Sequence, residues 1–294
     1  MRVLTVVNSS NPQALDASML LAAYFSSQGI ENDVVSVLEI PTPVDLAIGG
    51  QQALESAGIH PFDMAIALGG DGTILRTARV AMLFDAPVMG INFGHLGFLA
   101  NPAEPGVVPM VAAALAGDVT EDRRASLLVE VVCEGDEEMP ADQRGPRQFT
   151  ALNEVTITRG SCPRNLEACV SISGDEVCTL RGDGVIVATA TGSTAYALSA
   201  GGPLVSPGLE GMVVVPLATH TLQSRAIVTE RHDVVETGFD FAEGYTFAEV
   251  QLDGAALAFD APIERIIVRC GDDPARLLFY KKESFYQRIA RTFF

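Results

Sequence analysis

The chain has 294 residues, of which 48% are hydrophobic and 19% charged, and its formal net charge is −18. This length allows one large or two ordinary domains, and the hydrophobic fraction is ample for a core. The strongly acidic balance argues against a nucleic-acid partner and against an anionic membrane surface. No run approaches the roughly 18–20 consecutive apolar residues of a membrane helix, so a soluble protein is expected.

The cysteines and histidines give no sign of a disulfide framework or a zinc site. The five cysteines are odd in number and form no C-x-x-C pair, and only four histidines occur. A reduced, cytoplasmic protein is therefore expected. Residues 1–7 carry one charge and a short apolar run, which is typical of an opening strand rather than a signal peptide.

Lysine is almost missing from the sequence. Only two lysines occur, Lys281 and Lys282. A Walker-type G-x-x-x-x-G-K-[ST] loop and the catalytic lysine pattern of protein kinases are therefore excluded. If the protein binds phosphate groups, it must use backbone N–H groups, arginines and a metal ion.

Up to about residue 120, short apolar runs alternate with helical patterns. The predicted strands and helices are, in chain order, strand 2–7, helix 14–28, strands 34–37 and 64–68, helix 73–84, strand 87–92 and helix 105–115. Gly29 and Gly117 stand where C-terminal helix caps belong. This alternation is typical of β-α-β units on a parallel sheet. Residues 1–120 are therefore predicted to form a Rossmann-like α/β domain.

After about Glu121 the pattern changes to strands with few helices. Strand-like runs lie at 126–133, 149–158, 168–173, 185–190, 212–216, 247–252 and 263–269, with one short helix at 194–200. We therefore expect a mostly antiparallel β domain over residues 121–279. The stretch 134–147 has no periodicity and is interpreted as an exposed hairpin extension without a catalytic part.

The tail, residues 280–294, is predicted to form a helix that packs back on the first domain or on another subunit. Phe285, Ile289 and Phe293 recur at the spacing of one helical face. Arg288 and Arg291 come late in the helix, where its dipole favours cations. The aromatic residues that could contact another subunit are Tyr286, Phe293 and Phe294.

The first glycine-rich element joins a buried-type strand to a helix and reads Gly69-Gly70-Asp71-Gly72-Thr73. Glycine permits positive φ angles and a close approach of ligand to backbone. The N-terminus of the following helix favours phosphate. A carboxylate held there either takes a proton from an attacking hydroxyl or holds Mg²⁺, and Arg76 and Arg79 could neutralise phosphate oxygens. In the simpler alternative, Asp71 only caps a tight turn.

The second glycine-rich element spans residues 181–205. A strand leads into a hydroxyl-rich turn, and a short helix opens near Thr194. Tyr196 could stack on a base or bond a ribose hydroxyl. Asp183 could accept a hydrogen bond from an adenine amino group or a ribose hydroxyl. Considered without the first glycine-rich element, residues 181–205 could equally well form a capped helix beside a sheet with no binding role.

Together these motifs resemble those of the NAD kinases in kind and order. The Leu-Gly-Gly-Asp-Gly-Thr string ending at Thr73 is also similar to a signature of diacylglycerol kinases, sphingosine kinases and phosphofructokinases. Those families do not share the other motifs together. The other motifs are, in chain order, Phe93–Leu99, Asn153-Glu154, the 181–205 element, His220-Thr221-Leu222 and Asp253-Gly254. The resemblance spans nearly the whole chain.

The resemblance implies a kinase that transfers the γ-phosphoryl group of ATP to the 2′-hydroxyl of the adenosine ribose of NAD, giving NADP. It implies Asp71 as general base, Mg²⁺ or another divalent cation on the ATP phosphates, a site in the cleft between the two domains, and a homodimer or homotetramer. The residues implied for ATP or phosphate are Gly69, Gly70, Gly72, Thr73 and Arg76. Those implied for NAD are Asp71, Gly72, Arg76, Phe98, Asn153, Glu154, Arg164, Arg181, Asp183, Thr194, Ala195, Tyr196, Ala197, Leu198 and Ser199.

Other readings of single positions stay open. From the residues alone, Asn153-Glu154 could open a solvated strand, Arg164 could be a surface arginine, and Phe98 could belong to the core. The sequence departs from the family pattern in three places, which are Ala190 for a proline, Ala255 for a glutamine or arginine, and Ala226 for a proline after Arg225.

Two other functions remain as alternatives. A lipid kinase would need an exposed apolar entrance or a basic patch that attracts a membrane, and the net charge of −18 disfavours this function. A sensor that binds NAD or NADP without turnover could use the same residues.

Overall fold

The computed structural model describes residues 1–94, 97–140, 144–162, 164–220, 224–239 and 248–294. The motif residues His95, Leu96, Thr221 and Leu222 lie outside the described residues, as does Phe247 of one predicted strand. The chain divides into two compact units, the first comprising Met1–Pro41, Gly49–Arg124 and Asp273–Phe294 and the second comprising Thr42–Ile48 and Ala125–Asp272. No helix in the described part of the chain combines the length and apolar character that crossing a membrane requires.

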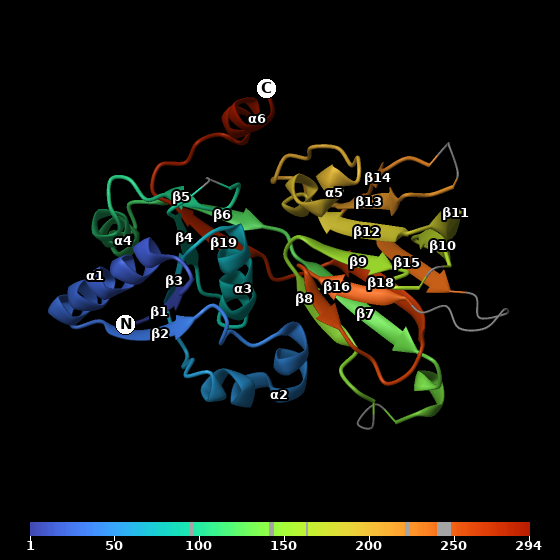
Figure 1. Ribbon diagram of the computed structural model, residues 1–294, viewed down its shortest axis with the longest axis horizontal. Coiled ribbons are helices and arrows are strands. Elements are labelled where there is room, and N and C mark those ends of the chain that lie inside the picture. Colours follow the sequence, from blue (N-terminus) through green and yellow to red (C-terminus); the bar gives the residue numbers. More distant parts are fainter. Residues whose placement is uncertain (95–96, 141–143, 163, 221–223, 240–247) are drawn as a thin grey trace. The chain divides into compact units, whose positions relative to one another are not determined.

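The first unit is built on one seven-stranded sheet (Figure 1). Its strands are β1 (Arg2–Val7), β2 (Glu31–Ser36), β3 (Met64–Leu68), β4 (Val88–Asn92), β5 (Asn101–Pro102), β6 (Thr120–Arg124) and β19 (Ala275–Phe279). Its helices are α1 (Pro12–Gln28), α3 (Asp71–Met82), α4 (Val107–Ala116) and α6 (Phe285–Phe293). Helix α2 (Pro43–Ser56) begins among the residues of the second unit and ends among those of the first. The strand order is β2-β1-β3-β4-β19-β6, with β5 beside β4. All pairs are parallel except β19 with β6.

Helices cover the central strands of this sheet on both faces. All five residues of β3 are buried, which explains its uninterrupted apolar sequence. On one face, Leu21 of α1 and Met110 of α4 belong to the same core cluster as Ile66. On the other face, Ile74 of α3 lies so close to Gly90 of β4 that a β-carbon there would collide with it. The prediction of an α/β unit with a parallel sheet is confirmed.

The second unit is a sandwich of two six-stranded antiparallel sheets. One sheet has the order β11-β10-β15-β18-β7-β8, from β7 (Leu127–Cys133), β8 (Gln148–Ala151), β10 (Leu166–Ile172), β11 (Asp175–Gly182), β15 (Val234–Phe239) and β18 (Ile263–Cys270). The other has the order β14-β13-β12-β9-β16-β17, from β9 (Glu154–Thr158), β12 (Gly184–Thr189), β13 (Met212–Leu217), β14 (Ile227–Val228), β16 (Glu249–Leu252) and β17 (Ala255–Leu257). Its short helical turns are the 3-10 helices Asp136–Glu138 and Gly192–Thr194, and α5 (Tyr196–Ser199).

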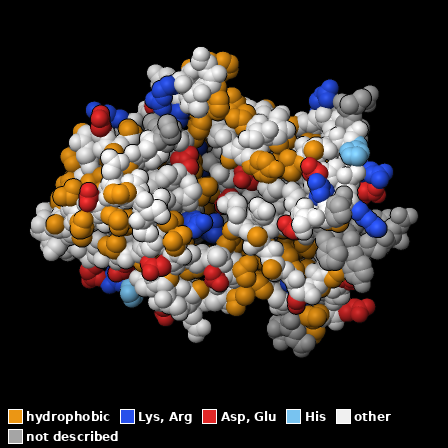
Figure 2. All heavy atoms as spheres, in the orientation of Figure 1, with side chains coloured by type: hydrophobic (Ala, Val, Ile, Leu, Met, Phe, Trp, Pro, Cys, Tyr) orange, Lys and Arg blue, Asp and Glu red, His pale blue; other side chains and the backbone are white. Residues whose placement is uncertain are grey.

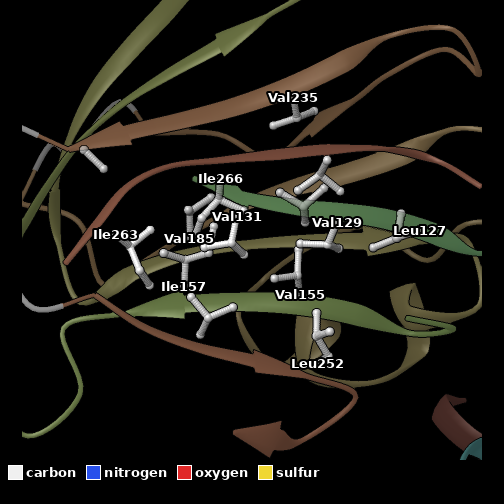
Figure 3. Packing of buried hydrophobic residues seen from close by; sticks show 14 of the residues in the cluster. Leu127, Val129, Val131, Val155, Ile157, Val185, Val235, Leu252, Ile263 and Ile266 are labelled. Carbon is white, nitrogen blue, oxygen red and sulfur yellow. The ribbon is translucent and has the colours of Figure 1, made fainter. Parts of the chain in front are cut away.

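The core of the second unit lies between its two sheets (Figure 3). Leu127, Val129 and Val131 alternate along β7 and point inward, while the residues between them are only partly buried. From the opposite sheet, Val155 and Ile157 of β9 join the same cluster. This period-two pattern is what an antiparallel sheet with one buried face requires. The prediction of a mostly antiparallel C-terminal unit is confirmed.

Both signs of charge occur on the surface despite the acidic composition. Figure 2 shows acidic and basic side chains interspersed on the visible face. Several form exposed ion pairs, such as Arg276 with Glu121 at 2.8 Å. Screened pairs of this kind add little to stability.

Several elements differ from those predicted. The expected strand 149–158 is two strands, β8 and β9, which belong to different sheets. The expected helix 194–200 is a 3-10 turn followed by a single α-turn. The stretch 134–147, where 141–143 lie outside the described residues, is anchored by a buried ion pair between Asp136 and Arg147 at 2.7 Å. The elements α2, β5, β6, β11, β14, β15, β17 and β19 are absent from the predicted set.

Candidate functional site

Asp71 is the first residue of α3, directly after the glycine pair that follows β3. Its Oδ2 accepts a hydrogen bond from the backbone N–H of Phe98 at 2.9 Å, and its Oδ1 accepts one from Leu99 at 3.4 Å. A β-carbon on Gly97 would collide with the Asp71 carboxylate, so only glycine allows this approach. The segment from Gly97 to Leu99 therefore holds the carboxylate in one orientation at the start of α3.

Two opposing influences set the protonation of Asp71. Burial is the larger and raises the pKa of Asp71 above its ordinary value. The N–H groups of Phe98 and Leu99 and the charges of Arg288 and Arg124 act in the opposite direction. The result is a carboxylate that is a stronger base than an exposed aspartate.

The glycines of the first motif serve close approach rather than unusual φ angles. None of Gly69, Gly70 and Gly72 is among the described glycines with positive φ. Gly69 faces Thr73 so closely that a β-carbon would collide with its side chain. Around Gly70 and Gly72 the space is open. No side chain caps α3, which leaves its N-terminus suited to an anion.

The two arginines of α3 differ in exposure. Arg76 is exposed, and its Nη1 lies 3.4 Å from the carbonyl oxygen of Val37. Arg79 is only 8% exposed and belongs to the interior of the unit. Of the two, Arg76 is the one accessible to a phosphate group.

In the second unit, Asn153 and Glu154 lie where the chain passes from β8 in one sheet to β9 in the other. They are 9% and 7% exposed, so a solvated strand start is ruled out. Among the described residues, Asn153 Oδ1 and Glu154 Oε2 are buried without a hydrogen-bond partner. Buried polar atoms are nearly always paired, so these two mark a place where a polar ligand can bind.

Asp253 organises this crossing. Its carboxylate accepts three successive backbone N–H groups, from Leu152 at 2.9 Å, Asn153 at 2.7 Å and Glu154 at 3.2 Å. The backbone N–H of Asp253 in turn donates to the Glu154 carbonyl at 3.0 Å. Asp253 has a φ of 47° and precedes Gly254. This role was not predicted, although an Asp-Gly pair between two strand patterns is a recognisable turn signal.

The charge of Asp253 also affects Glu154. Burial and then the Asp253 charge raise the pKa of Glu154 to about 7. Glu154 is therefore a carboxyl group that changes its charge near neutral pH in the free protein.

We predict that Asp253→Asn lowers the free energy of unfolding by about 1–3 kcal/mol, because a single amide oxygen cannot accept all three N–H groups. Asparagine tolerates the left-handed φ, so the backbone of the turn should persist. The variant should also lower the pKa of Glu154 by removing a nearby negative charge. Urea unfolding tests the first effect, with Asp175→Asn, an exposed site on β11, as control. Equal stability of the two variants would contradict it.

The second glycine-rich element packs directly on Asn153. The Thr189 N–H donates to the Asn153 carbonyl at 2.8 Å, and the Thr189 hydroxyl donates to the Leu152 carbonyl at 2.7 Å. A β-carbon on Gly192 would collide with the same Asn153 carbonyl. The structure thus brings two predicted motifs together in one small region. After this turn, Tyr196 is 48% exposed and Ala197 is fully buried.

Three further predicted NAD residues of this unit are Arg164, just before β10, Arg181, in β11, and Asp183, just before β12. Arg181 is exposed and pairs with Glu167 at 3.1 Å. Asp183 pairs with Arg159 at 2.6 Å. Arg164 is exposed, and no described contact fixes its side chain. The sequence motifs did not identify Arg159, the ion-pair partner of Asp183.

Among the described residues, no group of three or more His, Cys, Asp or Glu side chains could hold a metal ion. Both oxygens of Asp71 already accept backbone hydrogen bonds. Mg²⁺ is commonly held through substrate phosphates rather than by protein side chains alone.

Two family models and several full-length relatives match this chain. The model of the ATP-NAD kinase N-terminal domain matches residues 6–119, and that of the ATP-NAD kinase C-terminal domain matches residues 152–278. The NAD kinase of Heliobacterium modesticaldum is 32% identical over 97% of this chain and 95% of its own length. The NAD kinase of Polaromonas naphthalenivorans is 35% identical over 92% of this chain and 88% of its own.

Two solved structures are similar to this one. Yeast NADH kinase, solved with NADH, has a TM-score of 0.79 at 20% identity, covering 99% of this chain and 87% of its own, a likeness of fold alone. An NAD kinase from Archaeoglobus fulgidus, solved with ATP, has a TM-score of 0.66 at 26% identity, covering 100% and 97%. With both family domains and full-length relatives matched, the chain belongs to the ATP-NAD kinase family.

Proposed function

We propose that this chain transfers the γ-phosphoryl group of ATP to the 2′-hydroxyl of the adenosine ribose of NAD, giving NADP, with Asp71 as general base. As a member of its family the chain is an NAD kinase. The assignment of Asp71 rests on one observation, a carboxylate held by the Phe98 and Leu99 N–H groups at the uncapped start of α3.

The environment of Asp71 supports proton removal. A carboxylate has about four lone-pair sites, and the two backbone N–H groups use one on each oxygen. The free sites can accept the proton of a hydroxyl. Because burial raises the pKa of Asp71, its ionised form has a greater affinity for that proton than an ordinary aspartate.

Phosphate binding is assigned to the start of α3. The residues are Gly69, Gly70, Gly72, Thr73 and Arg76. The open space at Gly70 and Gly72 lets phosphate oxygens reach the backbone N–H groups. A divalent cation on the phosphates, when bound, would neutralise charge that develops in the transition state. Such neutralisation suits a chain with a net charge of −18.

Binding of NAD is assigned first to Asn153 and Glu154. Asn153 can donate and accept hydrogen bonds, and the Glu154 carboxylate can accept from two vicinal hydroxyls. Their unpartnered buried oxygens support this assignment. The other residues proposed to contact NAD are Asp71, Gly72, Arg76, Phe98, Arg164, Arg181, Asp183, Thr194, Ala195, Tyr196, Ala197, Leu198 and Ser199.

A single assay tests the proposal. The purified protein is incubated with ATP, Mg²⁺ and NAD, and NADP is measured by a coupled NADP-specific reaction. Formation of NADP in proportion to enzyme is the expected result. Binding of NAD without product would instead identify a sensor. Phosphorylated diacylglycerol without NADP would identify a lipid kinase.

A cytoplasmic homodimer or homotetramer is also proposed, from the family resemblance. Tyr286 and Phe294 of the tail are 70% and 97% exposed, which supports their use as subunit contacts. Light scattering after size-exclusion chromatography tests the oligomeric state. A monomeric mass at the protein concentration used for activity assays would contradict the proposed oligomer.

A further inference from the structure

The C-terminal helix α6 carries one buried charged residue. Arg288 is 5% exposed, whereas Tyr286 and Arg291 of the same helix are exposed. The helix begins with a capping box in which the Ser284 hydroxyl accepts from the Gln287 N–H. Burying a guanidinium is unfavourable unless its N–H groups are satisfied. The burial of Arg288 therefore indicates that its guanidinium makes specific contacts.

The contacts of Arg288 lead to the segment beside Asp71. Its Nη1 donates to the carbonyl oxygen of Gly97 at 3.1 Å. Its Nε lies 3.5 Å from the carboxylate of Glu283, and its guanidinium lies 5.8 Å from the centre of the Phe279 ring. Gly97 is the residue whose close approach to the Asp71 carboxylate excludes any side chain.

The aromatic residues of α6 hold the next residue of that segment. The Phe98 ring stacks on Phe293 at a centroid distance of 6.0 Å and an interplanar angle of 17°. It also lies 6.2 Å from the ring of Phe285. The backbone N–H of this same Phe98 donates to Asp71. Thus α6 contacts two successive residues of the segment that orients the carboxylate.

We propose that Arg288 is a positioning residue for the proposed phosphoryl transfer. By holding the Gly97 carbonyl, it fixes the peptide units whose N–H groups from Phe98 and Leu99 keep the Asp71 carboxylate in its reacting orientation. The inference rests on the proposed role of Asp71. It assigns to the C-terminal helix a part in catalysis without contact to substrate.

The charge of Arg288 supports the same role. Arg288 of α6 and Arg124 at the end of β6 are the charged groups that oppose the effect of burial on the pKa of Asp71. Loss of Arg288 should raise this pKa further, so less of the ionised base is present on the acid side. The acid limb of the pH–rate profile should then move to higher pH.

The test compares Arg288→Met, Arg288→Lys and Arg291→Met. Methionine keeps the length of the stem but removes the donors and the charge. Lysine keeps the charge and one donor group. Arg291 is the matched control, because it is exposed on the same helix and pairs with the same Glu283. For each variant, kcat, KM for NAD and ATP, the pH–rate profile and the thermal unfolding midpoint are measured.

We expect R288M to lower kcat about 10- to 100-fold with little change in either KM, as for a displaced catalytic group. Its acid limb should move to higher pH, R288K should recover part of kcat, and R291M should behave as wild type. A folded R288M with wild-type kcat overturns the proposal. A fall in kcat that follows only the amount of folded protein, with an unmoved acid limb, overturns it too.

Hydrogen exchange separates this proposal from the proposed function. In the free enzyme, the amides of Phe98 and Leu99 should exchange faster in R288M than in R291M, because their segment opens more often. A wild-type enzyme that makes no NADP overturns the role of Asp71 and the catalytic part of this proposal. Equal exchange in the two variants overturns the positioning contact itself. If R288M fails to fold, F293L replaces it, because this substitution loosens the ring contact with Phe98. F293L should lower kcat and speed the exchange of the Phe98 and Leu99 amides, both less than R288M would. Wild-type kcat and exchange in F293L overturn the proposal.

Discussion

Asp71→Asn is expected to lower kcat about 10²- to 10⁴-fold, the range by which a general base accelerates proton transfer. Asparagine has nearly the same shape and keeps one oxygen that can accept from Phe98 or Leu99. It cannot take the proton of the ribose hydroxyl. The KM for NAD should change much less than kcat, because the lost interaction belongs to the transition state.

The same substitution should change how the stability of the protein depends on pH. Burial raises the pKa of Asp71 in the folded state, so the unfolded chain ionises at lower pH than the folded one. Stability contributed by such a group is complete below the unfolded pKa and is lost as pH rises through the folded pKa. Replacing the carboxylate removes that loss but leaves one of the Phe98 and Leu99 N–H groups without an acceptor. The stability of D71N relative to wild type should therefore increase as pH rises from acid to neutral values.

The control for D71N is Asp16→Asn, on the exposed face of α1, which should leave both kcat and stability unchanged. Steady-state rates and urea unfolding at two pH values complete the measurement. Retention of more than a tenth of the wild-type kcat by D71N would contradict the general-base role. Asp71 would then act through a hydrogen bond that an amide oxygen can also accept.

The elements that could be predicted are those whose signals are local. The strand Met64–Leu68 has the predicted bounds because its five apolar residues are followed directly by two glycines. The α1 helix ends where Gly29, in the left-handed region, caps it. The N-terminal parallel sheet and the antiparallel second unit likewise follow from patterns within single segments.

The crossing at Asn153 could not be predicted in the same way. The sequence predicts one strand over residues 149–158, but the chain changes sheets there. The carboxylate that accepts three successive N–H groups at this crossing belongs to Asp253, about a hundred residues later. A similar separation hides Arg288, whose partner Gly97 lies 191 residues earlier. In both cases the motif residue is visible in the sequence, whereas the residue that orients it is supplied by tertiary structure.

Glu154→Gln is expected to raise the KM for NAD about 10- to 100-fold, because hydrogen bonds to a charged acceptor contribute about 1.5–3 kcal/mol. In the wild type, NAD affinity should increase from pH 6 to pH 8, since the pKa of Glu154 is raised to about 7 and the ionised form is the better acceptor for two hydroxyls. NAD binding should release a proton near pH 7. In E154Q, affinity should be independent of pH over this range.

The stability of the free protein gives an independent test of the same carboxyl group. Because burial and Asp253 raise its pKa from 4.5 to about 7, its ionisation should lower the free energy of unfolding by roughly 3 kcal/mol once pH exceeds the folded value. The loss should begin above pH 4.5 and be nearly complete at pH 8, and E154Q should not show it. Urea unfolding from pH 5 to 8 measures the difference, with the exposed Glu138→Gln as control. Parallel pH curves for wild type and E154Q would show that Glu154 titrates as an ordinary glutamate, and the pH dependence of NAD affinity would then have to come from another group.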